Sequence, residues 1–195
     1  NSYENYWTPE PAGFLATSNG GAKMLNGSSS AVKVGYPVME ESEGFSGKAA
    51  KLVTLDSRAH ALGSMAPITS GSLFTGTFSL NMLAPLKSTK FGIAYDKEPK
   101  LLKGVYKYKA GTNYIDGSVK PAQELNIIDE CSIAAVLYEA KDAAGKDVTL
   151  TGVDINTSEY RVAEARLKDG TDKDEWTTFE LAFEYLPEKS YDSTK

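Results

Sequence analysis

WTTFELAFEY, residues 176–185, carries the clearest structural signal in this chain. Aromatic and aliphatic side chains alternate there with small or acidic ones. Successive side chains of a β-strand point to opposite faces of a sheet, so the segment is predicted to be an antiparallel strand with one face buried. The buried face is expected to consist of Phe179, Leu181, Phe183 and Tyr185.

The same alternation recurs along the chain, and Gly, Asn, Asp, Ser and Pro, which favour turns, separate the alternating segments. About nine strands joined by such loops predict an all-β fold, a sandwich of two antiparallel sheets. Besides 176–185, strands are expected at AVKVGYPV (31–38), KLVTL (51–55), SLFTGTFSL (72–80), KFGIAY (90–95), LLKGVYKYK (101–109), CSIAAVLYE (131–139) and YRVAEARL (160–167).

The segments between the strands are interpreted as loops. TSNGGAKMLNGSSS (17–30) is expected to form turns, and DSRAHALGSM (56–65) is compatible with a short helical turn. KDGTDKDE (168–175) has the acidic density of a calcium loop but lacks the order of acidic residues that such a loop requires. It is therefore predicted to be a solvated hairpin.

The composition is that of a globular protein, with 41% hydrophobic and 24% charged residues. We predict one domain spanning residues 1–195 and expect a monomer. The net charge of −5 comes without a cluster of lysines or arginines, which argues against nucleic acid as a partner. No apolar run approaches the roughly 20 residues of a membrane-spanning helix, so this segment is not expected to insert into a membrane.

Motifs for cofactor, metal or nucleophilic chemistry are missing from the sequence. His60 is the single histidine and Cys131 the single cysteine, and no G-x-S-x-G, Walker lysine or G-x-G-x-x-G pattern occurs. We therefore predict no cofactor, no metal and no catalytic residue. His60 is expected to be a surface or hydrogen-bonded residue rather than a catalytic base, and Cys131 a packing residue.

Two sequence features suit carbohydrate binding. Continuing the alternation from the strand at 51–55 places Thr54, Asp56, Arg58 and His60 on one side, and Asp56 and Arg58 would offer sugar hydroxyls both acceptors and donors. Tyr106 and Tyr108 share one side of another strand, where their rings could stack on a pyranose. The alternatives are a solvent-facing strand end for the first row and core packing for the second.

Several sequence motifs, in the order in which they occur along the chain, resemble those of the putative carbohydrate metabolism domain. This is a family of surface or secreted proteins in glycan-foraging Gram-negative bacteria. The resemblance extends from YENYW at the start to Tyr185. The motifs that carry it are GSLFTGTF (71–78), FGIAYDKEPKLLKGVYKYKAG (91–111), DECSIAAVLYEA (129–140) and TSEYRVAEARLKDG (157–170), followed by WTTFELAFEY.

The resemblance implies a jelly-roll β-sandwich similar to carbohydrate-binding modules, usually preceded by an immunoglobulin-like domain and a lipoprotein anchor. Family members also continue beyond the point at which LPEKSYDSTK ends. Strands at the C-terminus of the jelly roll are therefore expected to be missing from this chain. The implied location is extracytoplasmic, at the cell surface, outer membrane or periplasm of a Gram-negative bacterium.

Three functions are compatible with these observations. The first is non-catalytic glycan binding, with Asp56, Arg58, Tyr106 and Tyr108 converging on a glycan ligand. The second is glycoside hydrolysis by a pair of carboxylates. The third is a structural or adhesive domain that binds another protein. Candidate carboxylates for hydrolysis are found at Glu40, Glu41 and Glu43, at Asp129 and Glu130, and at Asp172, Asp174 and Glu175.

Overall fold

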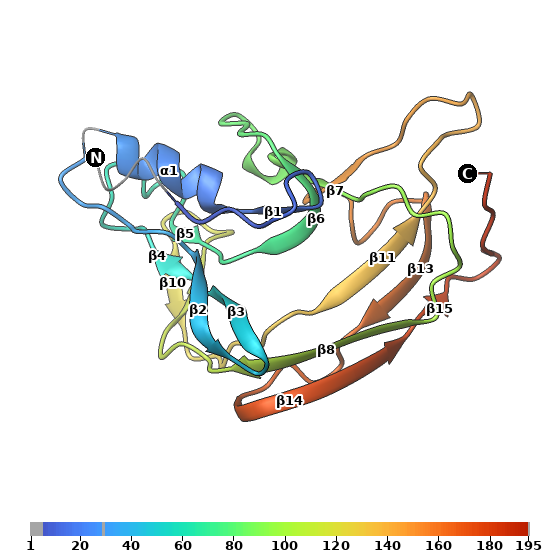
Figure 1. Ribbon diagram of the computed structural model, residues 1–195. Helices are drawn as coiled ribbons and strands as arrows, with labels where there is room; N and C mark the ends of the chain where they lie inside the picture. Colours follow the sequence, from blue (N-terminus) through green and yellow to red (C-terminus); the bar gives the residue numbers. More distant parts are fainter. Residues whose placement is uncertain (1–5, 29, 195) are drawn as a thin grey trace. The chain divides into compact units, whose positions relative to one another are not determined.

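The computed structural model describes residues 6–28 and 30–194, and its regular secondary structure is almost entirely β-strand in antiparallel pairs (Figure 1). This confirms the predicted all-β class, while the jelly-roll connectivity stays a prediction. The chain divides into two compact units. Unit 1 comprises Asn1–Ile93 and Asn113–Asn126, and unit 2 comprises Ala94–Thr112 and Ile127–Lys195.

In unit 1, strand β6 (Leu73–Phe78) pairs with β1 (Leu15–Thr17) on one side and with β7 (Thr89–Phe91) on the other. Gly76 allows the close approach of β7, because its φ is +127° and a Cβ atom there would lie 2.1 Å from the carbonyl oxygen of Lys90. The rings of Phe74 and Phe91 meet edge to face across the pair, with their centroids 5.3 Å apart.

Three further strand pairs complete unit 1. They are β2 (Val38–Gly44) with β3 (Gly47–Leu52), β4 (Leu55–Asp56) with β5 (Ile68–Thr69), and β9 (Tyr114–Asp116) with β10 (Gln123–Leu125). A short 3-10 helix, η1 (Pro85–Lys87), precedes β7. The segment 56–65, which was compatible with a helical turn, leaves β4 after Asp56 and continues as hydrogen-bonded turns.

The strand predicted at 31–38 is wrong except for its last residue, Val38. The side chain of Asn26 takes the place of a strand partner: its Oδ1 accepts the backbone N–H groups of Val34 and Gly35 at 2.9 and 3.3 Å, and its Nδ2 donates to the carbonyl of Gly35. Because these backbone groups are satisfied by a side chain, the segment needs no β-ladder.

Helix α1 (Asn19–Gly27) lies where the sequence predicted turns. Asn19 is fully buried, donating to the carbonyl of Val38 at 2.8 Å and accepting its N–H at 3.0 Å. Ala22 and Leu25 are buried on the same helix. Tertiary contacts thus outweigh the weak helix propensity of Asn and Gly. Within the described residues, no helix is both long and apolar enough to cross a membrane.

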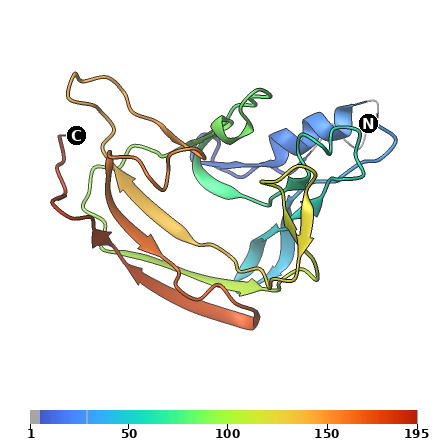
Figure 2. The ribbon, with the colours of Figure 1, turned by 180° about the vertical axis from the view of Figure 1, so that it is seen from behind.

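Unit 2 is built on two groups of strands. The long strands β8 (Leu101–Tyr108) and β14 (Lys173–Ala182) run antiparallel and lie side by side in both views (Figure 1 and Figure 2). Strand β13 (Arg161–Arg166) pairs with β11 (Ala134–Tyr138) and with β15 (Glu184–Tyr185). Among its described residues, the buried apolar ones are Leu150, in β12 (Leu150–Thr151), and Val162, Ala163 and Ala165 in β13.

The decisive segment 176–185 shows the predicted alternation: Phe179, Leu181, Phe183 and Tyr185 are half-buried and the residues between them are exposed. It is not one strand, however. Strand β14 begins earlier, at Lys173, and ends at Ala182. After Phe183, whose N–H donates to the carbonyl of Lys100, the chain pairs with β13 instead of β8.

Candidate functional site

Two of the four polar residues predicted in a row near β4, Asp56 and Arg58, belong to a compact ionic cluster in unit 1, here called the Arg58 cluster. The guanidinium of Arg58 donates to both carboxylate oxygens of Asp56, from Nε at 3.0 and 3.2 Å and from Nη2 at 2.7 Å. Nη2 also donates to Oε1 of Glu124 at 2.7 Å. One cation is therefore shared by two carboxylates.

Local backbone geometry explains why Asp56 and Arg58 face outward together. Oδ1 of Asp56 accepts the backbone N–H of Arg58 at 3.0 Å, which closes a turn directly after β4. Ser57 between them is buried and anchors that turn, because its N–H donates to the carbonyl of Pro67 and its hydroxyl bonds to that of Thr69 at 2.8 Å. Glu124 is brought to this turn by β10.

The cluster remains open to solvent, with side-chain exposures of 32% for Arg58, 47% for Asp56 and 50% for Glu124. The hydrogen bond from Arg58 is the main cause that lowers the pKa of the Asp56 carboxyl group below its usual value. The bonds from both carboxylates in turn raise the pKa of Arg58. The cluster therefore presents charged donors and acceptors in a fixed arrangement at neutral pH.

His60 does not continue the predicted polar row. It is 4% exposed, because the strand ends at Asp56 and the following turns direct the ring inward. Nδ1 accepts the N–H of Leu62 at 3.0 Å, and Nε2, which must then carry the proton, lies 3.0 Å from the carbonyl of Leu25. Nε2 also lies 3.1 Å from Oγ of Ser28. These contacts give His60 a structural role beside the end of α1.

Tyr106 and Tyr108 lie on one face of β8 in unit 2, and both are half-buried. The ring of Tyr106 packs edge to face on Phe179, with centroids 5.9 Å apart, and its hydroxyl donates to the carbonyl of Asp169 at 3.3 Å. Burial is the main cause that raises the pKa of Tyr108 to about 12. An open depression of about 240 Å³ adjoins Tyr108, smaller than usual small-ligand sites.

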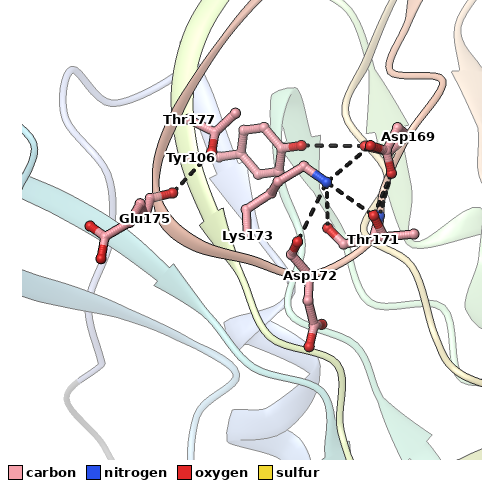
Figure 3. Close-up of polar contacts among 7 residues, drawn as sticks. All are labelled: Tyr106, Asp169, Thr171, Asp172, Lys173, Glu175 and Thr177. Atoms are coloured by element: carbon pink, nitrogen blue, oxygen red, sulfur yellow. Dashed lines mark hydrogen bonds and ion pairs between the residues drawn. The ribbon is translucent and has the colours of Figure 1, made fainter.

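The loop before β14 contains a second ionic cluster, here called the Lys173 cluster (Figure 3). The ammonium of Lys173 donates to Oδ2 of Asp169 and Oγ1 of Thr171, both at 3.0 Å, and to the carbonyls of Thr171 and Asp172 at 3.3 and 3.4 Å. The ammonium group of Lys173 thus occupies the position at which the oxygen atoms of the acidic loop converge. The loop leads directly into β14 instead of forming the predicted solvated hairpin.

Comparison with known proteins identifies the family of this chain. The profile of the putative carbohydrate metabolism domain matches residues 1–195. The chain belongs to this family. No curated protein matches it.

Two solved structures resemble this member of the carbohydrate metabolism domain family. A putative glycoside hydrolase from Bacteroides thetaiotaomicron is 35% identical, with a TM-score of 0.79, and the match covers 92% of this chain and 51% of that one. A putative glycoside hydrolase from Bacteroides vulgatus is 30% identical, with a TM-score of 0.72, covering 92% of this chain and 70% of that one. The chain thus spans about half the length of the first relative.

The two predicted residue pairs of this family member lie in different units. Asp56 and Arg58 are bonded to each other in unit 1, while Tyr106 and Tyr108 belong to unit 2. Convergence of the two pairs on one glycan therefore stays a prediction. Glu124 was missed because it lies in a three-residue strand within a segment that resembles a loop, 66 residues from Arg58.

Proposed function

We propose that this chain is a non-catalytic carbohydrate-binding module that acts outside the cytoplasm, at the surface of a bacterial cell. Membership of a carbohydrate metabolism family supports the class of ligand. The observation that carries the proposal is the Arg58 cluster, in which two carboxylates hold one partly exposed guanidinium.

The chemistry of the cluster suits sugar hydroxyls, each of which both donates and accepts hydrogen bonds. The guanidinium supplies donors in a planar fork and the carboxylates supply acceptors. Because Arg58 is already held by Asp56 and Glu124, little side-chain freedom is lost when a ligand binds. The groups stay partly hydrated, so dissociation constants between about 1 μM and 1 mM are expected.

Glycoside hydrolysis is the second candidate, favoured by the description of both solved structures as putative glycoside hydrolases. A glycosidase needs one carboxylic acid that keeps its proton, which requires a raised pKa. In the Arg58 cluster the guanidinium lies between the carboxylates and lowers the pKa of Asp56. The guanidinium favours the ionised form of Asp56, and therefore binding over acid catalysis by this residue.

The test measures binding of a panel of polysaccharides and oligosaccharides by isothermal titration calorimetry. Arg58→Ala should weaken binding by roughly tenfold to a hundredfold, the usual effect of losing hydrogen bonds to a charged group. The matched control is Arg166→Ala, since Arg166 is 39% exposed and also lies beside a glutamate, Glu164. This control should bind as the wild type does.

The two alternatives give different results in the same experiment. Release of reducing sugar that disappears in Asp56→Asn or Glu124→Gln would establish hydrolysis and overturn the proposal. Absence of binding to every glycan in the panel would favour the protein-binding alternative. Equal affinities of wild type and Arg58→Ala would exclude the Arg58 cluster as the site.

A further inference from the structure

Unit 1 contains a pocket of about 420 Å³ that none of the residues of the Arg58 cluster lines. It lies between the N-terminal segment, β1, the start of α1 and the end of β6, and is here called the β1–β6 pocket. Its volume falls within the roughly 300–1,000 Å³ usual for small-ligand sites. Its lining includes Tyr6, Thr8, Glu10, Thr17, Thr77 and Phe78.

We propose that the β1–β6 pocket binds one or two uncharged sugar rings of the glycan. The choice of ligand class rests on the proposed function, whereas the location rests on the geometry of the pocket. The pocket would provide selectivity for the kind of sugar, in addition to the polar contacts of the Arg58 cluster.

Two aromatic rings give the pocket an apolar surface on which the C–H groups of a pyranose can lie. The ring of Phe78 packs against α1, because a Cβ atom on Gly20 would lie 2.9 Å from it. The ring of Tyr6 is held by Tyr36, with centroids 5.3 Å apart, and by the ammonium of Lys23, 5.6 Å from its centre. Both rings are therefore positioned before a ligand arrives, which lowers the entropy cost of binding.

Hydroxyl groups and one carboxylate also line the pocket, beside several small and apolar residues. Thr8, Thr77 and Glu10 are exposed and contribute to the wall, together with the more deeply buried Thr17. An amphipathic lining of this kind matches a sugar ring, which has apolar faces and a polar rim. The carboxylate of Glu10 repels anions, so the pocket should prefer neutral sugars to uronic acids.

The test uses the fluorescence of Trp7, which lies next to Tyr6 in the sequence and is half-buried. The protein has two tryptophans, so Trp176→Phe leaves Trp7 as the single reporter. In this background we titrate neutral monosaccharides and disaccharides, and in parallel the corresponding uronic acids. A saturable change in emission is expected with neutral sugars, and a weaker response with the acids.

A blocking variant tests the location without removing a packing residue. Thr77→Phe places a ring in the pocket at an exposed strand position where aromatic residues are well tolerated, and should weaken sugar binding by roughly tenfold or more. Thr178→Phe, at an exposed position of β14 in unit 2, is the matched control and should leave it unchanged. Glu10→Gln should raise the affinity for uronic acids relative to neutral sugars.

The possible failures can be told apart. If glycans bind and Arg58→Ala weakens them, but Thr77→Phe binds small sugars as the wild type does, the pocket proposal is wrong and the proposed function stands. Equal or stronger binding of uronic acids would overturn the assignment to neutral sugars. If no carbohydrate binds in either assay, both proposals fail together.

Discussion

Arg58 in unit 1 and Lys173 in unit 2 are both cations bound by aspartate, but their surroundings differ. The partners of Lys173 lie within four residues of it in the chain, and its side chain is 21% exposed. Arg58 joins a neighbouring aspartate to a glutamate 66 residues away, and it is 32% exposed. The Lys173 cluster uses its donors to close a loop, whereas the Arg58 cluster holds two strands together and leaves charged atoms accessible. The Arg58 cluster is therefore the better candidate for contact with a ligand, because its charged atoms are more accessible than those of the Lys173 cluster.

Replacement of Phe179, whose ring packs against Tyr106, should have the largest effect on stability. Phe179 supports Tyr106, whose hydroxyl bonds to Asp169. Because Phe179 is half-buried, Phe179→Ala should lower the free energy of unfolding by about 3 kcal/mol, near the low end of the range for phenylalanine truncation. Urea denaturation measures this change, with Phe45→Ala, whose side chain is in an exposed turn, as the milder control. Loss of glycan binding in folded Phe179→Ala would show that unit 2 takes part in recognition.

Lys173→Met should lower the thermal midpoint by a few degrees and leave glycan affinity unchanged. The substitution keeps most of the side-chain volume but removes the ammonium that satisfies Asp169, Thr171 and Asp172. Differential scanning calorimetry and a binding titration on the same sample separate the two effects. Lys146→Met, at an exposed turn, is the control. A drop in affinity as large as that of Arg58→Ala would contradict the structural role given to the Lys173 cluster.

Acid should weaken the Lys173 cluster over a defined pH range. Hydrogen bonds from Thr171, followed by the bond from Lys173, lower the pKa of Asp169 from 3.8 to about 2. A carboxyl group with a lowered folded-state pKa stabilises the fold above its unfolded-state pKa, and this contribution is lost as the pH falls through the folded-state value. The difference in thermal midpoint between wild type and Asp169→Asn should therefore shrink as the pH falls from about 4 to about 2. A constant difference across this range would show that the ionisation of Asp169 contributes nothing.

The smallest effect is expected for Lys103→Ala. Lys103 pairs with Glu180 at 2.9 Å across β8 and β14, but the two side chains are 55% and 62% exposed. Exposed pairs of this kind contribute about 0–1 kcal/mol because water screens them. Neither the thermal midpoint nor glycan affinity should change measurably. Lys173 is more buried than Lys103, and we attribute its larger contribution to stability to this difference. Equal destabilisation by Lys103→Ala and Lys173→Met would contradict this explanation.

Patterns that depend on neighbouring residues could be predicted from the sequence. The alternation at 176–185 identified the two faces of β14, and the spacing of Asp56 and Arg58 placed their side chains together. In each case the physical cause acts over two or three residues, so it is visible in the order of residues.

The predictions that were wrong or incomplete depend on contacts between residues that are far apart in the sequence. The side chains of Asn19 and Asn26 satisfy backbone groups of a later segment, which allows a helix at 19–27 and removes the need for a strand at 31–37. The end of β14 at Ala182 depends on where β13 offers a new partner. Glu124 joins the candidate site only through its hydrogen bond with Arg58. Propensity alone cannot predict such partners, because tertiary contacts override it.

The two buried asparagines also affect the chemical durability of the protein. Asn19 and Asn26 are each followed by glycine, which lacks a Cβ atom and so lets its backbone nitrogen approach the preceding side-chain amide readily. Conversion of either amide to a carboxylate would replace a donor with a negative charge facing a carbonyl oxygen, that of Val38 or Gly35. While α1 stays folded, its backbone and the bonds of both amides restrain that approach. Deamidation of Asn19 or Asn26 is therefore expected to require local opening of helix α1.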